Sequence, residues 1–430
     1  MLNTMEEIQL FFQKRKYLGI KLGLERMQYL LERLGNPEKK LRTIHVAGTN
    51  GKGSTIQFLQ NVLINNDYKV GVFTSPSFTN LCGHFFINGK EIQEQDFIST
   101  FKKLLPFIKE LDGIGNSPTE FEILTVLAIY HFRENVDIAL FETGMGGRDD
   151  TTNVITPIVS VITNVSYDHS HFLGSTIEEI TLHKAGIIKE NRPVIVGNVH
   201  ESSRKIISAE ARKNNASLYL LNEHFSYRIF SNNIEWSYCD EFTVSFSLGF
   251  HGIYQIENIS IVLMVIYYLN RHLGIKISWD KTIPSIERTK LIGRFEKINN
   301  DPPIILDSAH NVAGIKAFIQ SVEEHYPKEE KHLLFAGFKD KELEEMLQSL
   351  KGHFKTISIT TFDHERAATL TDMSEFIEKY HLTVVHDWQE EVLTMLNHST
   401  RSNINFVTGS LHFIAQVRTF ILEQMKKDYV

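Results

Sequence analysis

Short apolar runs alternate with amphipathic stretches along the chain from residue 43 onward. Five runs in the first half have the length and the mainly apolar character of buried parallel strands, and they cover residues 44–47, 70–73, 138–141, 159–162 and 194–196. Segments with helical periodicity separate most of them. This alternation predicts a doubly wound α/β sheet, in which ligands bind at the carboxyl ends of the strands.

Two regions of the first half differ from this pattern. The first forty residues have a helical periodicity that ends at Gly35-Asn36-Pro37. Residues 217–250 alternate apolar and polar positions and are rich in aromatic residues, which predicts a small antiparallel sheet. The apolar periodicity then predicts a long helix over residues 252–273.

A second α/β series begins near residue 302, with candidate strands at residues 304–306, 333–335, 356–359, 384–385 and 406–407. A polar stretch over residues 297–303 separates the two series. We therefore predict a larger N-terminal, P-loop-type doubly wound domain over residues 1–296 and a smaller C-terminal Rossmann-like α/β domain over residues 297–430. A cleft between two such domains is a natural ligand site.

Composition and charge narrow the class of protein further. Hydrophobic residues make up 42% of the 430 residues and charged residues 23%, which excludes disorder over most of the length. The net charge of −7 has the wrong sign for a chain-wide nucleic-acid surface. The longest apolar run, residues 259–269, is about half the ~20 residues that a membrane span needs. Cys82 and Cys239 form no disulfide framework, and the first residues lack a signal-peptide pattern. We expect a reducing, cytoplasmic setting and no default nucleic-acid partner.

The strongest local motif is the glycine-rich turn after the first strand, in the segment His45-Val46-Ala47-Gly48-Thr49-Asn50-Gly51-Lys52-Gly53-Ser54. Glycines let backbone N–H groups approach phosphate oxygens, and the start of the next helix adds a partial positive charge. Lys52 is suited to neutralise the outer phosphates of a nucleotide, and Ser54 to bind Mg²⁺. Gly53 separates Lys52 from Ser54, so the turn departs from the strict phosphate-loop pattern. A plain glycine-rich turn is the alternative.

Three further residues stand out in the first half, two of them as possible metal ligands at the same edge of the sheet. Glu142 ends a strand and opens into glycines, where a carboxylate can complete a Mg²⁺ shell or cap its own turn. His169 follows the end of the next strand and is either a ligand or a structural histidine. Lys184 lies on an apolar helical stripe, on a helix that we expect to start with a capping box at Ser175-Thr176-Ile177-Glu178. A lysine there is paired, chemically altered or extended to the surface.

The second series carries a comparable group of residues at the end of its first strand. Asp307 and His310 follow residues 304–306 and precede a helical stretch. Arg294 lies near the predicted domain boundary. From there its side chain either reaches a bound nucleotide or faces solvent.

Together these motifs resemble the folylpolyglutamate synthases, the folate branch of the Mur ligase superfamily. The resemblance covers nearly the whole chain in order, at residues 23–27, 34–37, 74–76, 121–125, 142–153, 163–164, 168–169, 173–187, 255–258, 293–296, 307–311 and 407–411. It implies an ATP-dependent ligase that adds L-glutamate to the γ-carboxylate of a reduced folate. The carboxylate takes the γ-phosphoryl group of ATP and becomes an acyl phosphate, from which the amine of glutamate displaces phosphate.

The resemblance also implies roles for individual residues. Those that hold ATP would be Thr49, Asn50, Gly51, Lys52, Gly53, Ser54, Asn258, Arg294 and Asp307. Two Mg²⁺ ions are expected, with metal ligands from Ser54, Glu142, His169 and a carbamylated Lys184. The residues implied in catalysis are Lys52, His169, Lys184 and His310. Those implied in substrate binding are Ser75, Pro76 and Asp150.

The chain departs from the usual family pattern mainly on the folate side. Ser77-Phe78 stands where His-Leu is usual, Gly83-His84-Phe85 where Glu-Arg-Ile is common, and Asp149 where Leu is usual, whereas Ser308 replaces a glycine on the nucleotide side. ATP and Mg²⁺ are therefore better supported than the exact pterin substrate, and dihydrofolate synthase activity, the addition of glutamate to dihydropteroate, stays open. The alternatives are a Mur-type ligase for another carboxylate and a non-catalytic ATP-binding protein.

Overall fold

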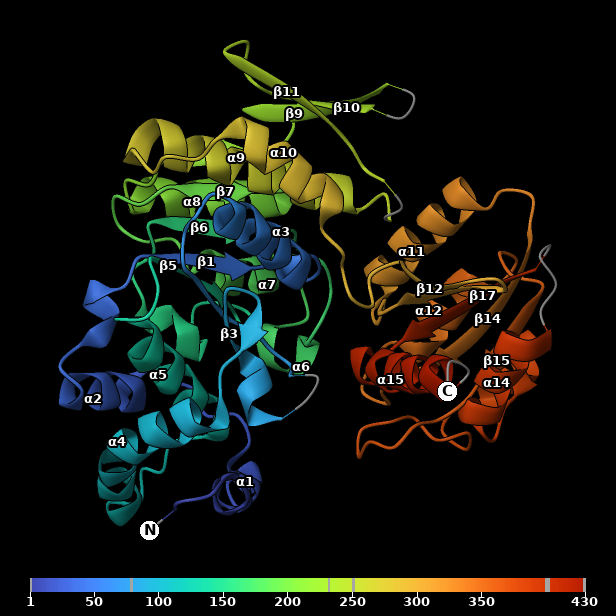
Figure 1. Ribbon diagram of the computed structural model, residues 1–430, viewed down its shortest axis with the longest axis horizontal. Coiled ribbons are helices and arrows are strands. Elements are labelled where there is room, and N and C mark those ends of the chain that lie inside the picture. Colours follow the sequence, from blue (N-terminus) through green and yellow to red (C-terminus); the bar gives the residue numbers. More distant parts are fainter. Residues whose placement is uncertain (1, 78–79, 231–232, 250–251, 399–402, 428–430) are drawn as a thin grey trace. The chain divides into compact units, whose positions relative to one another are not determined.

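The computed structural model describes residues 2–77, 80–230, 233–249, 252–398 and 403–427, so Phe78 of the folate-side motif lies outside the described residues. The chain divides into two compact units (Figure 1). One consists of Met1–Ser247 with Ile256–Thr289, and the other of Leu248–Gln255 with Lys290–Val430. Two stretches therefore differ from the predicted boundary at residue 296. Residues 290–296 lead into the first strand of the second unit, and Leu248–Gln255 leaves the first unit to join the second.

A mostly parallel eight-stranded sheet lies at the centre of the first unit. Its strands follow the order β4 (Lys90–Glu91), β3 (Phe85–Ile87), β2 (Val70–Phe73), β5 (Ile138–Glu142), β1 (Thr43–Ala47), β6 (Val159–Ile162), β7 (Val194–Val196) and β8 (Leu218–Leu220). Strand β1 pairs with β5 on one side and with β6 on the other. Because the chain runs from β1 to β2 and later crosses from β5 to β6, β1 marks the topological switch point where such sheets bind ligands.

The helices of the first unit follow the alternation that the pattern predicts. They are α1 (Met5–Gln13), α2 (Glu25–Arg33), α3 (Lys52–Asn65), α4 (Glu94–Gly113), α5 (Glu120–Phe132), α6 (Ser170–Leu173), α7 (Ile177–Ala185), α8 (Glu201–Lys213), α9 (Gln255–Leu273) and α10 (Trp279–Arg288). Short 3₁₀ turns occur at Lys16–Leu18, Pro37–Lys40, Leu81–His84 and Thr151–Val154. Every residue of β1, β2, β5, β6 and β7 is buried, as the mainly apolar runs indicate.

The aromatic region forms the predicted antiparallel sheet, with one difference. Strands β9 (Phe225–Phe230), β10 (Asn233–Tyr238) and β11 (Phe242–Ser247) pair in the order β11-β10-β9. Residues 218–220, which the prediction placed in the same small sheet, instead form β8 and pair in parallel with β7. The reason is burial, because Leu220 packs into the apolar core with Val194 and Val196.

The second unit is a six-stranded sheet with helices on both faces (Figure 1). Its strands are β12 (Glu296–Asn300), β13 (Pro303–Asp307), β17 (Asn403–Gly409), β14 (Glu330–Ala336), β15 (Thr356–Ile359) and β16 (Thr383–Val384). One core joins the sheet to α11 (Val312–His325), α12 (Leu343–Leu350) and α13 (Ser374–Tyr380), and a second joins it to α14 (Trp388–His398) and α15 (Leu411–Lys427). Ile305 faces the first core and Ile304 and Leu306 the second, as the two-residue period of a strand requires.

Among the described residues, no helix combines the length and the apolar character needed to cross a bilayer.

Candidate functional site

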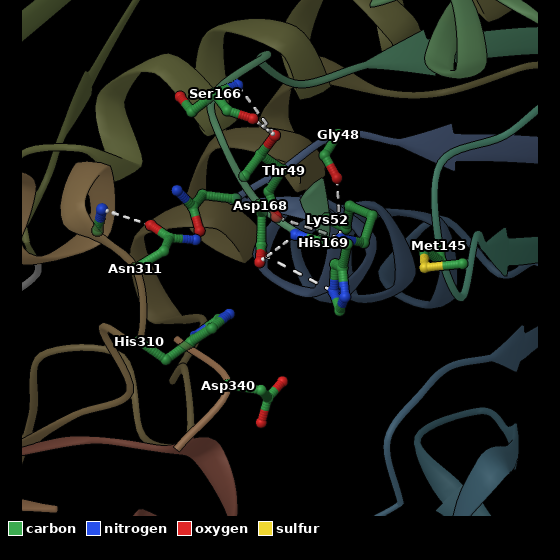
Figure 2. A network of polar contacts seen from close by, with 12 residues as sticks. Gly48, Thr49, Lys52, Met145, Ser166, Asp168, His169, His310, Asn311 and Asp340 are labelled. Carbon is green, nitrogen blue, oxygen red and sulfur yellow. Dashed lines mark hydrogen bonds and ion pairs between the residues drawn. The ribbon is translucent and has the colours of Figure 1, made fainter. Parts of the chain in front are cut away.

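The glycine-rich turn connects the carboxyl end of β1 to the start of α3, and hydrogen bonds fasten it to the segment that follows β6 (Figure 2). The Thr49 hydroxyl donates to the Ser166 carbonyl at 3.0 Å and accepts from the Ser166 N–H at 3.0 Å. The Asn50 N–H donates to Asn164 Oδ1 at 3.0 Å, and the Thr163 hydroxyl donates to the Asn50 carbonyl at 2.6 Å. The loop is therefore held in shape before any ligand binds.

Two glycines of this loop leave no room for a side chain. Gly48 has φ +153°, and a Cβ there would lie 1.8 Å from Thr163 Oγ1. Gly51 has φ +83°, and a Cβ there would lie 2.3 Å from Asn258 Oδ1. Asn258 lies in the first turns of α9 and is buried, so the structure brings this predicted nucleotide contact against the loop. Gly53 differs, because nothing lies within 4 Å of a Cβ built there.

Lys52, the first residue of α3, folds back over the loop. Its Nζ donates to the carbonyl oxygens of Gly48 at 2.9 Å and Thr49 at 3.2 Å (Figure 2). Ser54 lies in the same first turn and is buried. The loop therefore presents a cation and a hydroxyl at a helix N-terminus, where anions bind.

Glu142 lies at the carboxyl end of β5, next to the loop. The parallel register pairs Glu142 with Val46, just before Ala47 and the glycines. The Thr74 hydroxyl donates to Glu142 Oε2, so the carboxylate contacts the end of β2 as well as lying beside β1. Sequence reasoning named Glu142 but missed Thr74, although a hydroxyl directly after a predicted strand end is the signal that marks it.

Lys184 lies in α7 with only 3% of its surface exposed, so its side chain does not extend to solvent. Burial lowers its pKa to about 7, with a further lowering from the positive charge of Lys52 and an opposing effect from Asp168 and Asp150. Lys52, Asp168 and Asp150 affect the pKa of Lys184 because the fold brings α3 and the segments after β5 and β6 close to α7. The helix starts one residue later than predicted, with a capping box between Thr176 and Glu179 instead of Ser175 and Glu178.

Asp168 and His169 follow β6 on the same edge of the sheet (Figure 2). The His169 N–H donates to Asp168 Oδ1 at 2.9 Å, and His169 Nε2 lies 3.9 Å from Asp168 Oδ2. Among the described residues, no three His, Cys, Asp or Glu side chains form a group that could hold a metal ion. A divalent cation bound here therefore needs other oxygen donors, such as the Ser54 hydroxyl, nucleotide phosphates or a carbamate.

The predicted folate-side residues occupy two loops of this edge. Ser75 and the exposed Pro76 follow β2. Asp150 is buried, and its carboxylate accepts hydrogen bonds from the Met145 N–H at 2.7 Å and the Thr152 N–H at 3.0 Å. Burial raises the pKa of Asp150. Asp150 thus shapes the glycine-rich turn after β5, and its contact with substrate stays a prediction.

The second unit carries its own group of predicted residues at the carboxyl end of β13. Asp307 Oδ1 accepts from the Ala309 N–H at 2.9 Å, and Arg294 Nη1 donates to the Ser308 carbonyl at 3.3 Å. His310 Nδ1 lies 2.9 Å from the Ser308 carbonyl, and because a carbonyl oxygen only accepts, the ring donates its Nδ1 proton to it. The sequence therefore located this group correctly at a strand end of the second unit, while its roles stay predictions.

Comparison with known proteins matches both halves of the chain. The model of the Mur ligase middle domain matches residues 46–266, and that of the Mur ligase glutamate ligase domain matches residues 293–411. The chain is 33% identical to a dihydrofolate synthase/folylpolyglutamate synthase of Bacillus subtilis, over 97% of this chain and 99% of that one. It is 30% identical to a folylpolyglutamate synthase of Lacticaseibacillus casei, over 92% and 94%.

Solved structures agree with this match. A folylpolyglutamate synthase from Thermotoga maritima is 32% identical, with a TM-score of 0.82 over 97% of both chains. E. coli FolC in complex with DHPP and ADP is 26% identical, with a TM-score of 0.88 over 98% of both chains.

Proposed function

The chain belongs to the folylpolyglutamate synthase family of the Mur ligases, and from this premise we propose that it is an ATP-dependent ligase that adds L-glutamate to the γ-carboxylate of a reduced folate. ADP and inorganic phosphate are the other products. The observation that carries the proposal is the prearranged phosphate loop at the end of β1, with Glu142 beside it and the buried Lys184 within reach of the charge of Lys52.

ATP binding fits the geometry of the loop. The hydrogen bonds from Lys52 to two loop carbonyls hold its ammonium at the helix N-terminus, and a triphosphate offers stronger, charged acceptors. The backbone around the proposed triphosphate site belongs to Thr49, Asn50, Gly51 and Gly53. A solved relative, E. coli FolC in complex with DHPP and ADP, supports the same ligand.

The chemistry is an acyl transfer in two steps. A γ-carboxylate oxygen of the folate attacks the γ-phosphorus of ATP, the bond to the bridging oxygen breaks, and ADP leaves. The amine of glutamate then attacks the acyl carbon, loses a proton, and expels phosphate from the tetrahedral intermediate. Such chemistry depends on positioning and on neutralising the charge that develops on phosphate oxygens. Lys52 would neutralise charge on the phosphate oxygens, and the backbone amides of the loop would hold the phosphates in position.

Mg²⁺ fits the donor set at the carboxyl ends of β1 and β5. Ser54 and Glu142 are oxygen donors of the kind that Mg²⁺ prefers, and His169 lies near Asp168 at the neighbouring strand end. The metal would neutralise charge on the phosphates. Two ions are proposed, the second held through a carbamylated Lys184. A lysine amine with a pKa near 7 is largely neutral at physiological pH, and only the neutral amine combines with CO₂.

The second unit is proposed to complete the binding of nucleotide and glutamate. Asp307 and Arg294 would supply a carboxylate and a guanidinium for the nucleotide, and His310, whose Nδ1 contacts the Ser308 carbonyl, is the proposed catalytic residue of this unit. The match to the glutamate ligase domain model over residues 293–411 supports this division of roles.

The proposed setting is the cytoplasm, and the proposed state is a monomer. Cys82 and Cys239 are both free thiols, which suits a reducing compartment. Analytical ultracentrifugation of the full chain tests the monomer directly.

An acceptor assay tests the proposed function. The purified chain with ATP, Mg²⁺ and L-glutamate is given tetrahydrofolate, dihydropteroate or a UDP-linked peptide precursor in parallel, and phosphate release is measured. We expect glutamate-dependent release with tetrahydrofolate and none with the UDP precursor. Release with dihydropteroate as well would add the second activity that the names of several relatives carry. Nucleotide binding without release for any acceptor would overturn the proposal in favour of a non-catalytic protein.

A further inference from the structure

Asp307 is held by an unusual set of donors for a residue at the end of a strand. Its Oδ2 accepts from the Tyr254 hydroxyl at 2.6 Å and from the Phe295 N–H at 2.8 Å, and its Oδ1 accepts from the Ala309 N–H at 2.9 Å. A carboxylate offers about four acceptor positions. Within the described part of the chain, these three donors leave one position for a ligand.

The backbone at Phe295, which donates one of these hydrogen bonds to Asp307, is strained. Phe295 is buried and has φ +52°, a conformation that bulky residues rarely adopt. That conformation directs its N–H at Asp307. Strain of this kind persists only where the surrounding structure enforces it, and it is concentrated at functional sites.

Tyr254 reaches Asp307 from a segment distant in sequence. It belongs to Leu248–Gln255, the stretch that leaves the first unit to pack with the second. The neighbouring Ile253 N–H donates to Ser321 Oγ on α11 at 3.0 Å, which fixes the segment there. Burial and the Asp307 carboxylate raise the pKa of Tyr254 well above its ordinary value, so the phenol keeps its proton and remains a donor.

Given the ATP-dependent activity proposed above, we propose that Tyr254 is a positioning residue for nucleotide binding, which orients Asp307 so that its remaining acceptor position receives a ribose hydroxyl. Carboxylates at strand ends commonly accept hydrogen bonds from ribose hydroxyls. The same few residues lead on to Asn258, whose Oδ1 lies against the Gly51 position of the phosphate loop.

Calorimetric titration with ADP, 2′-deoxy-ADP and 3′-deoxy-ADP tests this role without relying on catalysis. Tyr254→Phe removes one hydroxyl and keeps the ring. We expect it to weaken ADP binding about tenfold, the effect of one hydrogen bond to a charged group. The loss should disappear with the deoxy nucleotide that lacks the partner hydroxyl. Tyr267→Phe is the matched control, because its phenol also donates to a carboxylate, Glu241 Oε2 at 3.3 Å, farther along α9.

A second variant distinguishes the loss of this hydrogen bond from a general folding defect. In an Asp307→Asn background, adding Tyr254→Phe should change ADP affinity no further, since the carboxylate that Tyr254 orients is gone. Equal losses for ADP and both deoxy nucleotides, or no loss at all, would overturn the role of Tyr254. That result would leave the ligase activity untouched, because wild-type phosphate release is measured separately. Wild-type protein that binds no ADP would overturn both.

Discussion

Lys184 shows how strongly its surroundings set the chemistry of one side chain. The sequence left three possibilities for a lysine on an apolar stripe, and extension to the surface is wrong because only 3% of the residue is exposed. Burial is the main cause of a pKa near 7, and Lys52 adds to it. The charged form is therefore costly, which favours either the neutral amine or conversion to an anion by CO₂. The helical spacing of apolar residues placed Lys184 on an apolar stripe, but it did not predict how deeply the side chain is buried.

We expect the stability of the protein to depend on pH through Lys184. Between about pH 7 and pH 10 the unfolded chain binds one more proton at this lysine than the folded chain, so the free energy of unfolding rises with pH across that window. In CO₂-free buffer, wild type should gain on the order of 5 kcal/mol relative to Lys184→Met as pH increases. Urea unfolding of both proteins at several pH values measures the difference. Parallel curves would show that the folded lysine titrates normally.

Lys52 should contribute charge to the reaction and little to the fold. Its ammonium contacts two loop carbonyls, so Lys52→Ala should lower stability by about 1 kcal/mol while reducing phosphate release by a factor of 100 or more, on the order expected for loss of a group that stabilises developing charge. Phosphate release and the thermal midpoint are the two measurements. Lys281→Ala, which removes an exposed ion pair with Asp67, is the control that should keep full activity. Turnover at the wild-type rate in Lys52→Ala would remove the lysine from the site.

In the first unit the buried strands were predictable and the edge strands β3 and β4 were not, whereas the edge strand β16 of the second unit was predicted near its observed place. The five mainly apolar runs of the first unit became β1, β2, β5, β6 and β7, because a parallel strand covered on both faces is apolar over most of its length. Strands β3 and β4 lack that signal, since they are short and pair antiparallel at an edge of the sheet. The fastening of the phosphate loop to Thr163, Asn164 and Ser166 was also missed, because it depends on two strand ends meeting in space.

The glycine loop gives a prediction in which stability and binding change in opposite directions. Gly53 lies in the first turn of α3 with open space around it, so Gly53→Ala should raise stability by about 0.5–1 kcal/mol through helix propensity. The added methyl should nevertheless weaken ATP binding, because it occupies the surface on which phosphate approaches the backbone. Thermal melts and ATP titration test the pair of effects. Gly48→Ala should instead lower both stability and ATP affinity, because its added methyl group would clash with Thr163. Unchanged ATP affinity in Gly53→Ala would argue that phosphates bind elsewhere.

At the scale of the whole molecule, each unit holds a predicted group of residues at the carboxyl end of a central strand. The sequence placed these groups correctly because strand ends can be located from hydrophobic pattern alone. It could not assign Leu248–Gln255 to the second unit, since that assignment rests on Tyr254 and Ile253 finding partners far along the chain. Long-range partners of single polar side chains leave no periodic signal.

Isotope transfer from acceptor to phosphate tests the proposed reaction most directly. Tetrahydrofolate labelled with ¹⁸O in its γ-carboxylate is incubated with the full chain, ATP, Mg²⁺ and L-glutamate, and the released phosphate is analysed by mass spectrometry. An acyl phosphate intermediate requires one labelled oxygen to leave with phosphorus, so we predict phosphate carrying a single ¹⁸O and a folate lengthened by one glutamate. Phosphate released without label would contradict the account, because ATP would then have been cleaved without activating the carboxylate.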